Sequence, residues 1–174
     1  MTDDARYEGL ELFSQADVVL LGVPGVGKTS YCNELAKLEV KAANIPVEHY
    51  VDVHNPNIVR STVDQRITTA LREMVNNENP VVVGLMCPAK EVLRRRTLVP
   101  KWNENIRSLS KSKGLPEVNY GEGHRYDHDL RAVTLSVRGA IRYYDVIRCK
   151  CVRAHPFSPQ EVAKSIKALL PAPG

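Results

Sequence analysis

The residues best suited to chemistry lie near the amino terminus, in the stretch GVPGVGKT from Gly22 to Thr29. The stretch fits the spacing GxxxxGK followed by Ser or Thr, in which glycines let backbone N–H groups surround phosphate oxygens. Lys28 would reach the β and γ phosphates of a nucleotide, and Thr29 would coordinate Mg²⁺. The sequence therefore predicts a site for ATP or GTP with Mg²⁺. The residues expected to contact the nucleotide are Gly22, Pro24, Gly25, Val26, Gly27, Lys28, Thr29 and Ser30.

Phosphoryl transfer also calls for a carboxylate at the end of a neighbouring strand, which holds Mg²⁺ or accepts a proton. Asp52 is the best candidate, because it ends an expected strand at the same sheet edge as the glycine-rich loop. The alternative is that Asp52 caps the turn HNPN that follows it. The most apolar run of the chain, at 81–87, carries Gly84 and no acid.

Arginines could stabilise the charge that develops on a transferred phosphoryl group. The nearest group downstream is Arg94, Arg95 and Arg96, with Arg125 further along. Consecutive residues of a helix point in different directions, so at most two of the three can reach one site. Each arginine taken singly is more typical of a solvated helix face than of a catalytic position.

The elements that must position these residues follow from the apolar periodicity and the turn signals. Strands are expected at 17–21, 47–53, 81–87, 115–120 and 145–152. Helices are expected at 30–38, 58–75, 89–96, 102–109, 129–144 and 158–170, the last with Ser158 as its N-cap. Strands that alternate with helices predict an α/β fold of the P-loop NTPase type, with three layers and a mainly parallel sheet of about five strands.

The expected domain plan is a polar amino-terminal extension at 1–16, a P-loop domain at 17–170 and a short tail at 171–174. Charge divides the chain unevenly. Residues 1–89 carry seven Lys and Arg against twelve Asp and Glu, whereas residues 90–153 carry fifteen against seven. The basic part includes a region at about 94–128 that could close over the loop as a lid.

Composition excludes several other classes. The amino-terminal segment lacks the pattern of a secretory signal and no apolar run is long enough to span a membrane, so we expect a cytoplasmic protein without a membrane partner. The four cysteines lack metal-site spacing, and Cys149 and Cys151 would share one face of a strand as core residues. The basic half lacks an RNA-binding signature, so nucleic acid is not an expected partner.

The loop GVPGVGKTSYCNELA resembles that of adenylate-kinase-like nucleotide kinases and of small-molecule phosphotransferases of the same class. VVVGLMCPAKEVLRRR is similar to the passage that leads into the lid of those kinases, and DVIRCKCVRAHPFSPQEVAKSIKALL to their closing strand and helix. The resemblance implies phosphate and magnesium roles for Lys28 and Thr29, and makes Arg94, Arg95, Arg96 and Arg125 lid candidates. The signature of an acid followed by Gly-x-Pro-Arg is missing here.

A second resemblance is to Ras-like small GTPases, whose loops also read GVGKTS. YVDVHNP is similar to a strand end in that class, and GHRYD to a reduced guanine-specificity motif with only Asp127 kept. A switching GTPase needs a magnesium-binding loop and a hairpin after its first helix. The connector of about half a dozen residues expected here suits a plain helix-to-strand loop.

The sequence thus favours a Mg²⁺-dependent protein that binds a nucleoside triphosphate and acts as a kinase-like phosphotransferase. Its acceptor would be a nucleoside monophosphate or another small molecule. Lys28, Asp52, Arg94, Arg95 and Arg125 are the candidate catalytic residues, and Thr29 and Asp52 the candidate metal ligands. The alternatives are an atypical small GTPase, or a pseudo-GTPase, without standard switch motifs, and a non-catalytic P-loop scaffold that binds a protein partner.

Overall fold

The computed structural model describes residues 15–23, 26–46, 65–98 and 126–171. These residues form four strands and five helices. The strands are β1 (Val18–Gly22), β2 (Ala42–Pro46), β3 (Val81–Met86) and β4 (Lys150–Arg153). The helices are α2 (Lys28–Lys37), α3 (Gln65–Asn77), α4 (Ala89–Thr97), α6 (Tyr126–Ile147) and α7 (Pro159–Lys167).

The four described strands form one parallel sheet in the order β2-β1-β3-β4. β1 lies in the middle, where Leu21 is opposite Ile45 of β2 and Gly84 of β3. Because all the strands run the same way, their carboxyl ends meet at one edge, and the glycine-rich loop leaves β1 at that edge. The predicted α/β fold with a parallel sheet is confirmed.

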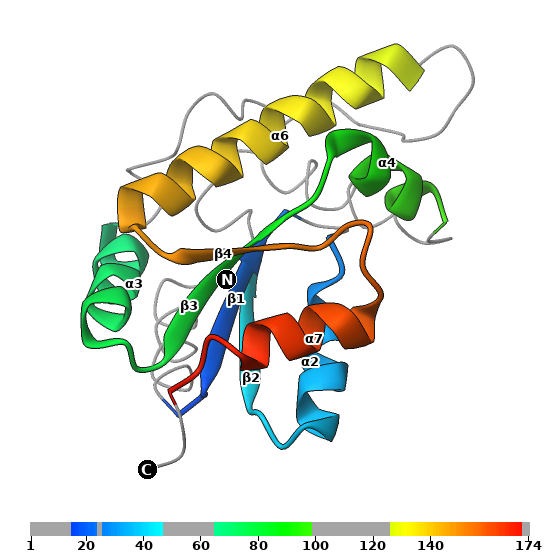
Figure 1. Cartoon of the computed structure of the whole chain (residues 1–174). Helices are drawn as coiled ribbons and strands as arrows, with labels where there is room; N and C mark the ends of the chain where they lie inside the picture. The colour runs from blue at the N-terminus through cyan, green and yellow to red at the C-terminus, as the bar shows by residue number, and fades with distance from the viewer. Residues whose placement is uncertain (1–14, 24–25, 47–64, 99–125, 172–174) are drawn as a thin grey trace, which may run out of the picture.

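Helices cover both faces of the sheet and give three layers (Figure 1). The helices α3 and α6 pack on one face, while α2 and α7 pack together on the other. The central strands are apolar on both faces, and every residue of β1 is buried. This pattern is typical of parallel strands that are covered by helices on both sides. Among the described helices, none has the length and apolar character that a membrane crossing needs.

The second described strand occupies a segment for which the sequence predicted no strand. β2 occupies Ala42–Pro46, directly before the expected strand at 47–53, which lies outside the described residues. The sequence AANIP has weak strand propensity, and pairing with β1 along its whole length overrides that preference. Only residues 38–41 separate α2 from β2, so the connector is shorter than expected.

The last strand was also misplaced, because 145–147 belong to α6 and β4 begins at Lys150. Tyr143, Tyr144 and Ile147 are buried at helical spacing, which keeps the chain helical up to that point. Arg148 then adopts a left-handed backbone with φ of 58° and ends the helix. Cys149 is half-buried and Cys151 is exposed, so the expectation that both are core residues was wrong; Val152 is the buried residue of β4.

Other local predictions agree with the structure. The helix α4 starts directly after Pro88, and α7 starts with the predicted cap. The Ser158 hydroxyl accepts a hydrogen bond from the Glu161 backbone N–H at 3.1 Å, and the Ser158 N–H donates to the Glu161 carboxylate at 3.1 Å. This capping box satisfies two N–H groups that the helix itself cannot pair. The helix expected at 102–109 and the strand expected at 115–120 lie outside the described residues.

Candidate functional site

The glycine-rich loop connects the buried end of β1 to the first turn of α2. The Val26 N–H donates to the Val23 carbonyl at 3.2 Å, which joins the two described ends of the loop. Gly27 precedes the helix with φ of 107° and ψ of 17°. At that φ a side chain would strain the backbone, so glycine is required by conformation.

Gly27 is required by space as well as by conformation. A Cβ atom on Gly27 would lie 2.9 Å from Cζ of Tyr31, one turn further along α2. Tyr31 is buried, and burial raises the pKa of its hydroxyl, which stays protonated. The aromatic ring therefore supports the loop from beneath, and only glycine leaves room for it.

Lys28 lies at the start of α2 and turns back across the loop. Its Nζ donates to the Gly22 carbonyl at 2.5 Å, so the ammonium group lies over the loop. Thr29 and Ser30 are exposed in the same turn of the helix. The first backbone N–H groups of a helix have no partner within it and attract anions. The described part of the loop thus suits an anion such as a polyphosphate, and Thr29 is exposed beside it.

Three consecutive arginines of α4 point to three different environments. Arg94 is exposed and pairs with Glu91 through Nε at 2.9 Å and Nη2 at 2.6 Å. Arg95 turns toward the loop, where its Nη1 donates to the Val26 carbonyl at 2.7 Å. Arg96 is buried. The sequence allowed two of these arginines to reach one site, and only Arg95 contacts a described residue of the loop.

Arg95 makes three further hydrogen bonds. Nη1 also donates to the Tyr31 hydroxyl at 3.2 Å, Nη2 to the Ala154 carbonyl at 3.3 Å, and Nε to Glu91 at 3.1 Å. Hydrogen bonds from Arg94 and then Arg95 hold the pKa of Glu91 near 2, well below its usual value, despite partial burial. Glu91 is therefore ionised and paired with Arg94 and Arg95, and it is a poor proton acceptor at neutral pH.

The end of β3, beside the loop, is closed by an aromatic side chain from α6. A Cβ atom on Gly84 would lie 2.6 Å from Cγ of Tyr144. The Tyr144 hydroxyl lies 3.2 Å from the Leu21 carbonyl and 3.0 Å from the Leu85 carbonyl, and burial raises its pKa. The ring fills the space that a side chain on Gly84 would need.

Several predicted site residues lie outside the described residues. They are Pro24, Gly25, Asp52 and Arg125, together with most of the expected lid at 94–128. β2 ends at Pro46, and the placement of Asp52 at the end of a strand stays a prediction, because 47–53 lie outside the described residues. Asp127 belongs to the first turn of α6. Within the described part of the chain, no cluster of three or more metal-ligand side chains is present.

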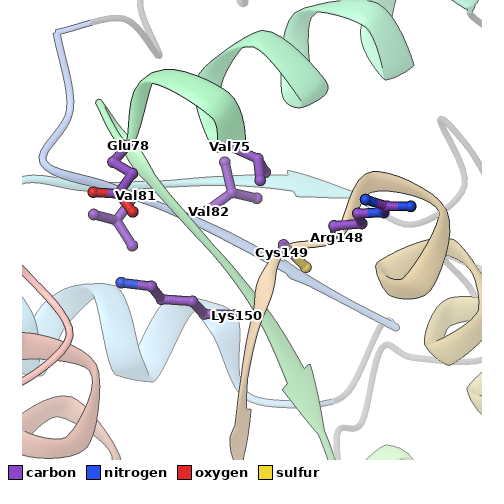
Figure 2. Close-up of a pocket in the computed structure, with 7 residues that line it drawn as sticks. All are labelled: Val75, Glu78, Val81, Val82, Arg148, Cys149 and Lys150. Carbon is purple, nitrogen blue, oxygen red and sulfur yellow. The ribbon is translucent and has the colours of Figure 1, made fainter.

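A cavity lies at the other end of the sheet. It has a volume of about 110 Å³ and is lined by residues at the amino ends of β3 and β4, including Val81, Arg148 and Lys150. Figure 2 shows the Glu78 and Lys150 side chains on one side of it and Arg148 on the other. Burial raises the pKa of Cys149 in its wall to about 12, so that thiol is not a nucleophile at neutral pH. The cavity is separate from the loop.

Sequence reasoning missed Tyr31, Tyr144 and Glu91 as parts of this region. Tyr31 follows the loop motif by two positions, and its packing under Gly27 becomes visible only when α2 is built. Glu91 precedes Arg94 and Arg95 by three and four residues, a helical spacing that signals ion pairs. Nothing local in the sequence links Tyr144 to Gly84.

Comparison with known proteins adds one match. The family model described as Kinase/pyrophosphorylase matches residues 1–166, which include the glycine-rich loop, Arg95 and Tyr144. A search of curated proteins found no match.

Proposed function

The chain belongs to the kinase/pyrophosphorylase family, and from that premise we propose that it transfers a phosphoryl group from a Mg²⁺-bound nucleoside triphosphate to a small acceptor. Membership makes it a nucleotide-using phosphotransferase. The nature of the donor, the need for Mg²⁺ and the nature of the acceptor are parts of the proposal. The observation that carries it is the glycine-rich loop, with Lys28 over it and a helix amino terminus behind it.

The proposal gives a role to two described residues of the loop, Lys28 and Thr29, and to candidates from other segments. Lys28 would exchange its hydrogen bond to the Gly22 carbonyl for phosphate oxygens, because an ammonium group forms stronger bonds with an anion. The exposed Thr29 hydroxyl would be a ligand of Mg²⁺, and Asp52 a second ligand or the group that activates the acceptor. Bound Mg²⁺ would neutralise charge on the phosphates. Arg94 and Arg125 stay candidates for contact with the transferred group.

Two features argue against a switching GTPase. Residues 38–41 are too few for a magnesium-binding switch loop between α2 and β2. β2 also pairs directly with β1 in parallel, and no antiparallel hairpin separates them.

A nucleotide-binding scaffold without turnover is the second candidate function. Tyr144 fills the space above Gly84, so β3 supplies no acid beside the loop. A protein that binds nucleotide and lacks an acid would hold its ligand without chemistry. Binding and turnover therefore have to be measured separately.

Lys28→Ala tests the nucleotide site. Calorimetric titration with ATP and with GTP, each with Mg²⁺, should give binding to the unchanged protein and a loss of about 10- to 100-fold in the variant, since a charge-assisted contact is removed. Lys37→Ala is the matched control, because Lys37 ends the same helix, is exposed, and pairs only with Glu34 in the described residues. Equal affinity in the unchanged protein and Lys28→Ala would contradict the proposed site.

Turnover is tested by incubating the unchanged protein with the preferred nucleotide, Mg²⁺ and a panel of nucleoside monophosphates and other small hydroxyl or phosphate acceptors. Acceptor-dependent release of the nucleoside diphosphate supports the phosphotransferase. Pyrophosphate should be measured in parallel, because the family description includes a pyrophosphorylase. Tight binding without either product would favour the scaffold.

A further inference from the structure

We propose that Arg95 is a positioning residue that holds the glycine-rich loop in the shape that receives phosphate, and that it does not itself contact the nucleotide. The inference rests on the proposed function in one respect, that the loop is the nucleotide site. It differs from the lid role that the sequence suggested for this arginine. The contacts of the guanidinium group carry the argument.

The hydrogen-bond capacity of Arg95 is nearly used up within the protein. A guanidinium group has five N–H donors in a rigid planar fork. Four hydrogen bonds leave the three nitrogens of Arg95, and their acceptors are Glu91, Val26, Tyr31 and Ala154. Binding of a phosphate in the usual two-pronged way would need two parallel donors, and the fork has no such pair to spare.

These four bonds join segments that are distant in sequence. Val26 belongs to the loop, Tyr31 to α2, and Ala154 to the chain just after β4. Glu91 lies one turn earlier on α4 and fixes the guanidinium from behind. The side chain of Arg95 is 22% exposed, so these hydrogen bonds are only partly open to competition from water. A guanidinium group held by Glu91 on one side and by Val26, Tyr31 and Ala154 on the other can fix the positions of these segments relative to one another.

The bond to the Val26 carbonyl bears directly on the phosphate site. The peptide unit between Val26 and Gly27 is planar, with its C=O and N–H pointing in opposite directions. When Arg95 fixes the carbonyl, it also fixes the direction of the Gly27 N–H. Backbone N–H groups of this loop are the groups that bind phosphate oxygens, so their orientation before binding determines affinity.

The neighbouring arginine provides a matched comparison. Arg94 is on the same helix and shares Glu91 as a partner, but its side chain is 59% exposed and, among the described residues, it donates hydrogen bonds to Glu91 alone. Loss of Arg94 therefore removes a similar positive charge without disturbing the loop.

The test is hydrogen–deuterium exchange in the nucleotide-free protein, which needs no catalysis and no ligand. Arg95→Met should raise exchange in peptides covering the loop and the first turn of α2 by about tenfold or more, because a charge-assisted bond to the loop is lost. Exchange in α7 should stay within twofold of the unchanged protein, and Arg94→Met should leave the loop unaffected. Unchanged exchange in the loop would overturn the proposal, and so would an equal increase throughout the core, which would indicate general stabilisation.

Arg95→Lys keeps the positive charge and a long side chain, and it covers the case in which Arg95→Met does not fold. Lysine cannot reach Val26, Tyr31 and Ala154 together, so the loop should again exchange faster. Nucleotide affinity should fall by about tenfold in Arg95→Lys. A third variant, Arg95→Ala, should also lose affinity, and millimolar methylguanidine should restore part of that loss. Reduced affinity with unchanged loop exchange would mean that Arg95 contacts phosphate, and would overturn the proposal. If the unchanged protein binds no nucleotide, the proposed function fails while the exchange result still decides the role of Arg95.

Discussion

The loop after β1 and the end of β3 lie side by side at one edge of the sheet, and they differ in how they are built. The two strands pair in parallel, with Leu21 opposite Gly84. Beyond β1 the chain opens into a glycine turn with Lys28, Thr29 and Ser30 at the surface or partly exposed. At the end of β3 the backbone is covered by the ring of Tyr144.

The difference shows that a phosphate-binding loop and an acid beside it depend on different features of a fold. Phosphate binding depends on a short, continuous segment whose conformation is local. An acid beside it depends on which helix packs over the neighbouring strand. In this protein α6 places a tyrosine there, and its hydroxyl contacts the carbonyls of both strands. Any acid in the mechanism must therefore come from another segment, and Asp52 remains the proposed one.

Gly84→Asp, which adds an acid to β3, should lower stability more than the other substitutions considered. Its Cβ would lie within 3 Å of the Tyr144 ring, and its carboxylate would be buried. Overpacking and a buried charge together should lower the free energy of unfolding by about 3 kcal/mol or more. Urea denaturation followed by circular dichroism measures the change.

The control for Gly84→Asp is the same substitution in a Tyr144→Ala background. Tyr144→Ala is itself destabilising, but it removes the ring, so Gly84→Asp should then cost less than it does alone. An equal cost in both backgrounds would show that the ring is not what excludes an acid.

Gly27→Ala, in the glycine-rich loop, should lower stability by an intermediate amount. The φ of 107° and the Tyr31 ring at 2.9 Å both oppose a methyl group, so the free energy of unfolding should fall by about 2 kcal/mol. Nucleotide affinity should fall too, because the loop must move to relieve the contact. Calorimetric titration and urea denaturation measure the two effects. Ser30→Ala, on the exposed side of the same turn, should change stability little, and a loss as large as that of Gly27→Ala would contradict the steric explanation.

The sequence predicted the features that depend on neighbouring residues better than those that depend on contacts between distant segments. The loop, the start of α4 after Pro88 and the capping box of Ser158 are local, and each was predicted. β2 was not predicted because AANIP has weak strand propensity. β4 was misplaced because α6 is followed by a left-handed residue, Arg148, which is neither glycine nor proline. Such positions carry no strong turn signal in sequence.

The residues of the candidate site also fall into those predicted from local sequence and those that depend on distant contacts. The motif identified Lys28 and Thr29, while the roles of Arg95 and Tyr144 depend on contacts between segments far apart in the chain. Arg95 was named because arginines favour phosphate sites and because of the resemblance to nucleotide kinases, whereas its bond to Val26 depends on the packing of α4 beside the loop. Periodicity correctly limited how many of the three arginines could face one way.

Glu91→Gln should have the smallest effect, and it tests whether the acid that follows β3 serves the arginines. The folded-state pKa of Glu91 is about 2, below its ordinary 4.5, because Arg94 and then Arg95 bind its anion. Its stabilising contribution is thus present above about pH 4.5 and is lost as the pH falls toward 2. Since Arg94 is largely exposed, the contribution should be about 1 kcal/mol at pH 6. Urea denaturation of both proteins between pH 6 and pH 2.5 should show the difference shrinking toward the acid end. A difference that stays constant with pH would mean that the charge of Glu91 is not what the arginines require, and the fixed orientation of Arg95 would then need another cause.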